Sequence, residues 1–165
     1  MSQPLNVLFL CTHNSARSIL AEAVLNHVAK GRFHAFSAGS SPRENQQPHP
    51  MALEVLSHAG VSIEGLSSKS WDAFAGPEAP HMDLIITVCD NAAGEVCPYW
   101  PGHPATAHWG YEDPSRVEGD ETHRRDAFRR TMLMMFERME LLLALPPEKL
   151  THALEASARE LAQGS

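Results

Sequence analysis

Short apolar runs alternate with helix-length amphipathic segments along most of the chain. The apolar runs predict strands over residues 5–10, 33–37, 83–88 and 106–109. Helical spacing of apolar residues predicts helices over residues 15–28, 50–59 and 122–145, followed by a shorter helical tail over 148–162. Residues 67–74 fit either a short polar helix or a loop. Strands alternating with helices favour a three-layer α/β domain around a parallel sheet, with the β-branched run at 83–88 near its centre.

The composition fits one globular domain. A chain of 165 residues with 43% hydrophobic content can bury a sizeable core. The formal net charge of -7, without a long basic block, argues against a nucleic-acid partner. The first residues lack a signal-peptide pattern and no apolar run approaches about 18 residues, so we expect a cytoplasmic protein without a membrane segment. In that reducing compartment, three cysteines favour redox or nucleophilic roles over a structural disulfide framework.

The loop after the first strand carries a cysteine and an arginine at its two ends. Cys11 ends the apolar run, and five residues separate it from Arg17: Thr12, His13, Asn14, Ser15 and Ala16. The start of a helix offers unpaired N–H groups and a partial positive charge, which attract an oxyanion and favour a thiolate. Arg17 adds donors that match tetrahedral oxygens, and Ser18 can donate a hydrogen bond to the thiolate. The loop predicts a nucleophilic Cys11 beside a bound oxyanion; an inert, buried cysteine is the structural alternative.

Two further cysteines lie downstream. Cys89 ends the strand at 83–88, and because ligands bind beyond the carboxyl ends of parallel strands, Cys11 and Cys89 can share one site. Cys97 falls in a Pro- and Gly-rich stretch that we interpret as a long functional loop. His103 and His108 lie near, but the two-residue cysteine spacing of structural zinc sites is missing, so we expect no metal. Two unrelated core or loop thiols remain an alternative.

Several motifs together resemble the low-molecular-weight protein tyrosine phosphatase superfamily, and within it the cytoplasmic arsenate reductases. The resemblance covers about residues 5–145. It rests on the loop Cys11-Thr12-His13-Asn14-Ser15-Ala16-Arg17-Ser18, on Ser37-Ala38-Gly39, on the apolar strand before Cys89, on Cys97-Pro98 and on His108-Trp109-Gly110-Tyr111-Glu112-Asp113-Pro114. It implies a flavodoxin-like fold with a four-stranded parallel sheet, in which residues 1–145 form the reductase domain and residues 146–165 a helical tail of the same domain.

The resemblance also implies a mechanism. The Cys11 thiolate attacks arsenate, Arg17 holds the oxygens, and Asp113, held on its loop by Pro114, protonates the leaving oxygen. Cys89 then attacks Cys11 and arsenite leaves. Cys97 next moves the disulfide to the Cys89–Cys97 pair, where a reductant can reach it. An ordinary Asp-Pro surface turn is the alternative interpretation of Asp113.

The expected partners follow from that chemistry. They are arsenate, with phosphate or sulfate as competing anions, and thioredoxin, or glutaredoxin with a low-molecular-weight thiol, as the source of electrons; no bound cofactor is expected, and the protein is expected to be a monomer. A phosphatase hydrolysing phosphate monoesters through a Cys11 phosphoenzyme is the alternative. It would use Arg17 and Asp113 but neither Cys89 nor Cys97. A small oxyanion-binding module would leave the acid and the paired thiols unexplained.

The chain departs from the family pattern at three positions. The gap between Cys89 and Cys97 is one residue longer than the family's six-residue gap, and Ala16 replaces a further, non-catalytic cysteine. Lys69 stands where some members place an aspartate that helps to bind potassium. Because Asn14, Glu22 and Ser37 match the other residues of that site, our hypothesis is that the Lys69 ammonium replaces the ion behind the loop. A solvent-facing Lys69 is the alternative.

Overall fold

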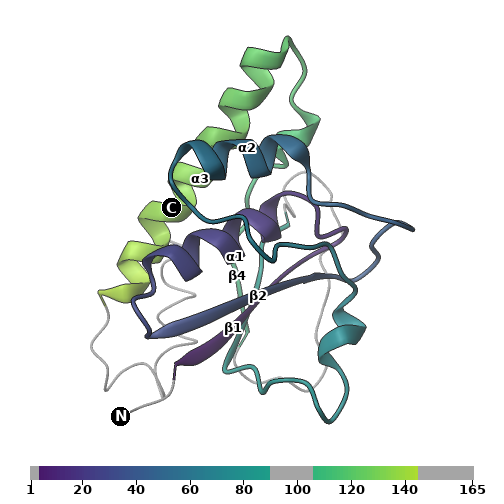
Figure 1. Ribbon diagram of the computed structural model, residues 1–165, viewed down its shortest axis with the longest axis vertical. Helices are drawn as coiled ribbons and strands as arrows, with labels where there is room; N and C mark the ends of the chain where they lie inside the picture. Colours follow the sequence, from purple (N-terminus) through teal and green to yellow (C-terminus); the bar gives the residue numbers. More distant parts are fainter. Residues whose placement is uncertain (1–3, 90–105, 145–165) are drawn as a thin grey trace.

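The computed structural model describes residues 4–89 and 106–144 and is built around a parallel four-stranded sheet in the order β2-β1-β3-β4 (Figure 1). The strands are β1 (Leu5–Cys11), β2 (Phe33–Gly39), β3 (Leu84–Thr87) and β4 (Thr106–His108). The helices are α1 (Arg17–Val28), α2 (Pro50–His58) and α3 (Glu121–Leu143), with the 3₁₀ helices η1 (Trp71–Phe74) and η3 (Pro114–Arg116). The predicted α/β fold with a four-stranded parallel sheet is confirmed.

Most predicted elements agree with the structure to within one or two residues. The strand predicted at 83–88 lies in the interior of the sheet, between β1 and β4. Of the segment at 67–74, only η1 is helical. The predicted tail at 148–162 and Cys97 lie outside the described residues.

The two faces of the sheet are covered by different elements. Val7, Phe9 and Cys11 of β1 belong to the main core, which contains buried residues of all three α-helices. Leu8 and Leu10 point to the other face and pack in a smaller cluster, against which η1 lies. Side chains of β1 alternate between the two faces of the sheet, so this strand contributes to both clusters. Within the described part of the chain, the predicted third layer is thin and consists of η1 and its neighbours.

The helices follow local sequence rules. His49 caps α2 by accepting a hydrogen bond from Met51 N–H through Nδ1 (3.1 Å), and Pro50 occupies the first turn. Asp120 caps α3 in the same way by accepting from His123 N–H (2.8 Å). Three methionines of α3, Met132, Met135 and Met139, are buried in the main core. Neither described part of the chain, 4–89 or 106–144, contains a helix long and apolar enough to cross a membrane.

Parallel pairing brings the carboxyl ends of β1, β3 and β4 to one edge. Leu10 of β1 pairs with Thr87 of β3, and Val88 N–H continues the ladder to the Leu10 carbonyl (2.9 Å). Trp109 N–H donates to the Thr87 carbonyl (2.8 Å) from the β4 side. Residues that directly follow these strands therefore start from the same edge as the loop after Cys11.

Candidate active site

Two hydrogen bonds converge on the sulfur of Cys11, which is 3% exposed. Asn14 N–H lies 3.1 Å from Sγ, and the Ser18 hydroxyl lies 2.9 Å from it. Ser18 Oγ also accepts a hydrogen bond from Asn14 Nδ2 (2.8 Å), so its own hydrogen is left to donate to sulfur. Both contacts tie the sulfur to the loop and to the start of α1.

Asn14 holds the loop in a left-handed conformation. Its φ is 58°, a geometry that asparagine tolerates better than most residues. Its Oδ1 accepts from Lys69 N–H (2.9 Å), and its carbonyl accepts from the Ser68 hydroxyl (2.6 Å). Ser68 was not predicted, because nothing in its local sequence shows that this serine lies against a loop more than fifty residues away.

Gly39 at the end of β2 lies directly behind the loop. A Cβ at this position would lie 2.6 Å from the Thr12 carbonyl oxygen, 2.9 Å from the His13 carbonyl carbon and 3.0 Å from the Asn14 nitrogen. All three are backbone atoms, so only glycine fits without moving the loop. The structure therefore requires glycine here because two backbone segments approach closely.

Arg17 and Asp113 meet on the other side of the loop. The Arg17 side chain is 6% exposed; Nη1 donates to the Tyr111 carbonyl (3.0 Å), and Nη2 lies 3.6 Å from Asp113 Oδ2. Asp113 Oδ1 accepts from both the backbone N–H (2.9 Å) and the hydroxyl (2.7 Å) of Ser115 at the start of η3. Arg116 Nε lies 3.9 Å from Oδ2. The structure thus brings together the two residues predicted to hold the oxyanion and to supply the proton.

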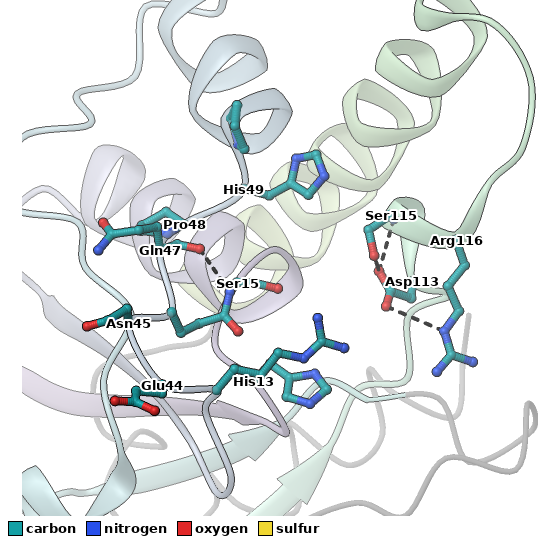
Figure 2. Close-up of a pocket in the computed structure, with 13 residues that line it drawn as sticks. His13, Ser15, Glu44, Asn45, Gln47, Pro48, His49, Asp113, Ser115 and Arg116 are labelled. Atoms are coloured by element: carbon teal, nitrogen blue, oxygen red, sulfur yellow. Dashed lines mark hydrogen bonds and ion pairs between the residues drawn. The ribbon is translucent and has the colours of Figure 1, made fainter.

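A cavity of about 540 Å³ opens beside the loop (Figure 2). Its wall includes His13, Arg43, His49, Asp113 and Arg116, and is otherwise rich in amide side chains. Burial and the charge of Arg124 lower the pKa of His49 from its usual 6.5, although Asp113 opposes the shift. The cavity borders the loop at His13 and Ser15, and its arginine and amide groups are suited to polar, anionic ligands.

Lys69 lies behind the loop with its ammonium turned toward backbone carbonyls. Nζ donates to the carbonyls of Ser67 (2.7 Å) and Ser37 (3.1 Å), and the Ser37 hydroxyl donates to Glu22 Oε1. Burial raises the pKa of Glu22, while the Ser37 hydrogen bond and the Lys69 charge oppose that shift. Burial lowers the pKa of Lys69, and Glu22 opposes it. Asn14, Glu22, Ser37 and Lys69 therefore form one connected group.

Cys89 directly follows the end of the β3 ladder and is fully buried. Its neighbour Val88 bonds to Leu10, the residue before Cys11, so the two cysteines extend from adjacent strands, which run about 4.8 Å apart. Cys11 is a free thiol, whereas Cys89 is disulfide-bonded. Among residues 4–89 and 106–144, no three His, Cys, Asp or Glu side chains are grouped as metal ligands.

Comparison with known proteins identifies the family. The model of the low molecular weight phosphotyrosine protein phosphatase family matches residues 6–156. The chain belongs to this family. Among curated relatives, the arsenate reductase of Bacillus licheniformis is 34% identical over 135 residues, covering 81% of this chain and 91% of the relative.

Solved structures of family members share the fold. An arsenate reductase from Archaeoglobus fulgidus is 27% identical with a TM-score of 0.65, covering 84% of this chain and 99% of that one. A thioredoxin-dependent arsenate reductase from Corynebacterium glutamicum is 30% identical with a TM-score of 0.53, covering 85% of this chain and 64% of that one. In this chain, the loop between Cys11 and Arg17 and the Asp113–Pro114 pair are accompanied by Cys89, which follows the adjacent strand.

Proposed function

We propose that this protein reduces arsenate to arsenite, with Cys11 as the nucleophile. One observation carries the proposal. The Cys11 sulfur receives two hydrogen bonds in a loop flanked by the Arg17–Asp113 pair, and Cys89 follows the adjacent strand. A hydrolase needs the first part of this arrangement but has no use for a second cysteine at the same sheet edge.

The first step forms a bond between sulfur and arsenic. The Cys11 thiolate attacks arsenate, an As–O bond to a hydroxyl group breaks, and the Asp113 carboxyl group gives the leaving hydroxyl its proton, so that water departs. Arg17 binds the remaining oxygens, and it carries their negative charge through the transition state. The 3.6 Å separation of Arg17 and Asp113 supports a shared role around one ligand.

The second step transfers two electrons to arsenic. The Cys89 thiolate attacks Cys11 Sγ, the sulfur–arsenic bond breaks with its electron pair going to arsenic, and arsenite leaves a Cys11–Cys89 disulfide. Cys97 then attacks Cys89, which releases the Cys11 thiolate and forms a Cys89–Cys97 disulfide.

A protein dithiol completes the cycle by reducing that disulfide. Thioredoxin is our first choice and glutaredoxin with a low-molecular-weight thiol our second. The thioredoxin-dependent relative from Corynebacterium glutamicum supports the first choice. Exchange with the reductant regenerates both thiols and oxidises the partner's dithiol, so electrons balance over each turnover.

We also propose that Lys69 takes the place of a structural potassium ion. The Ser37 carbonyl already accepts from Nζ, and the nearby Glu22 carboxylate is compensated by the ammonium charge. A potassium ion at this position would have to displace a cation that is tied to two carbonyls. The residues present therefore do not fit a bound potassium ion.

The test compares reduction with hydrolysis in matched variants. Arsenate-dependent NADPH oxidation is measured with thioredoxin and thioredoxin reductase for wild type, Cys89→Ser and Cys97→Ser, beside hydrolysis of p-nitrophenyl phosphate. Cys11→Ser serves as the control that removes both activities. We expect each relay variant to lose arsenate turnover while any slow ester hydrolysis survives.

Two outcomes would contradict this scheme. Arsenate turnover at the wild-type rate in both relay variants would exclude the relay. Efficient ester hydrolysis by wild type without arsenate reduction would favour the phosphatase alternative. Replacing thioredoxin with glutaredoxin and glutathione in the same assay identifies the reductant.

A further inference from the structure

Arg138 is a buried charge in a helix that otherwise buries mainly apolar side chains. It is 9% exposed and lies next to Met139 on α3, whose buried face also carries Met132 and Met135. A buried cation is costly unless its surroundings compensate it. Arginine at this position therefore calls for groups around it that stabilise its charge.

Two aromatic rings contribute to this compensation. The Arg138 guanidinium carbon lies 5.4 Å from the centroid of the Trp109 ring and 5.2 Å from that of the Tyr111 ring, both within cation–π range. The two rings are almost completely buried. Burial raises the pKa of Tyr111 to about 12, so the phenol stays neutral beside the cation.

The segment that carries the two rings, Trp109 to Tyr111, leads directly into the oxyanion site. The Tyr111 carbonyl accepts the 3.0 Å hydrogen bond from Arg17 Nη1, and Asp113 follows two residues later. Trp109 anchors the other end of the segment to the sheet through its bond to Thr87. A guanidinium that binds both rings fixes the position of this carbonyl and thereby the orientation of Arg17.

We propose that Arg138 is a positioning residue for the oxyanion site, acting through Tyr111 on Arg17. The proposal deepens the proposed function and rests on its oxyanion site. Arg138 acts through Tyr111: it holds the Tyr111 carbonyl in position to accept the hydrogen bond that orients Arg17. Lysine is not equivalent, because its compact ammonium lacks the planar guanidinium that lies within cation–π range of both rings.

Binding of inorganic phosphate, measured by calorimetry, tests this inference separately from arsenate chemistry. The variants are Arg138→Met and Arg138→Lys, with Arg130→Met, an arginine that is 75% exposed on the same helix, as the matched control. We expect both Arg138 variants to bind phosphate roughly 10- to 100-fold more weakly, since small displacements of a binding group have effects of this size. Arg130→Met should bind like wild type. In the arsenate assay, the weaker oxyanion binding of the Arg138 variants should appear as a higher KM for arsenate.

A second measurement asks whether the effect runs through Arg17. In an Arg17→Lys background, adding Arg138→Met should weaken phosphate binding by less than about twofold, because coupled residues are not additive. A full, additive loss in that background contradicts the proposal. So does wild-type phosphate affinity in a folded Arg138→Lys or Arg138→Met protein, even when its Tm is lower, because that pattern belongs to a merely structural residue.

The two proposals fail in different ways. If the Arg138 variants bind phosphate more weakly than wild type, but wild type does not reduce arsenate, the proposed function is overturned and the positioning role is supported. Wild-type protein that reduces arsenate while Arg138 variants keep its affinity and KM overturns the positioning role alone.

Discussion

Adding a single methyl group behind the oxyanion loop should disable the protein while leaving its fold intact. In Gly39→Ala, the new Cβ would lie 2.6 Å from the Thr12 carbonyl oxygen, whereas ordinary contacts begin at 3.4 Å. The loop must therefore retreat by about 0.8 Å, the difference between those distances. The obstructing atoms belong to the backbone, so no side-chain rotation can relieve the contact.

That displacement sets the expected magnitudes. A shift approaching 1 Å at a reacting centre reduces catalysis by roughly 100-fold, which we expect in kcat/KM for arsenate. Overpacking of this kind costs about 1–3 kcal/mol in the free energy of unfolding. For a chain of this size each of those kcal/mol lowers Tm by about 2–4 °C, so the variant should remain folded at assay temperature.

Gly76→Ala is the matched control. It makes the same chemical change at a glycine with no heavy atom within 4 Å of the added Cβ. Coupled arsenate assays and thermal unfolding of both variants give the comparison, and Gly76→Ala should match wild type in activity. Gly39→Ala activity within twofold of wild type would refute the argument that backbone contact at this glycine sets the loop position.

Three further predictions concern the acid, the internal cation and the helix cap. Asp113→Asn should lower kcat for arsenate reduction by about 100-fold or more, the range for a lost general acid, whereas the exposed neighbour Glu112→Gln should not, in the same coupled assay. Exchanging sodium for potassium should leave wild-type activity unchanged while Lys69 is intact; a several-fold rise in potassium would contradict its role as the internal cation. Because folding lowers the pKa of His49 below 6.5, the unfolded chain binds its proton more readily, so stability should fall as pH drops through 6.5. Thermal unfolding of His49→Asn, which keeps a cap for Met51 N–H, should show a smaller loss over that range.

Local patterns predicted the elements of the fold well. The apolar run before Cys11 and the helical spacing after Arg17 are set by neighbours in sequence, so the strand, loop and helix fall where expected. The same holds for α3, whose buried stripe follows from residues three and four apart. The thin layer formed by η1 was not predicted, because alternation in β1 shows that two faces are buried without showing what covers each.

The supporting residues of the site were harder to predict than its reactive ones. Cys11, Arg17 and Asp113 are residue types whose chemistry is visible in sequence. Ser68, the Tyr111 carbonyl and Arg138 act through contacts with residues distant in the chain, and a backbone carbonyl carries no sequence signal at all. Lys69 was noticed only as a departure from the family pattern, and its bonds to the Ser37 and Ser67 carbonyls came from the structure.

The sequence by itself determined a parallel α/β fold and a thiol–arginine loop, because strand and helix periods, caps and turn residues act over a few neighbouring positions. Only the tertiary structure decided which distant residues support that loop. These are Gly39, whose backbone lies against the loop, Lys69, whose ammonium binds the Ser37 carbonyl, and Arg138, which contacts the Trp109 and Tyr111 rings. These contacts depend on which distant segments of the chain meet in the fold. A hydrophobic pattern in the sequence indicates that a side chain is buried, but it does not identify the residues that pack against it.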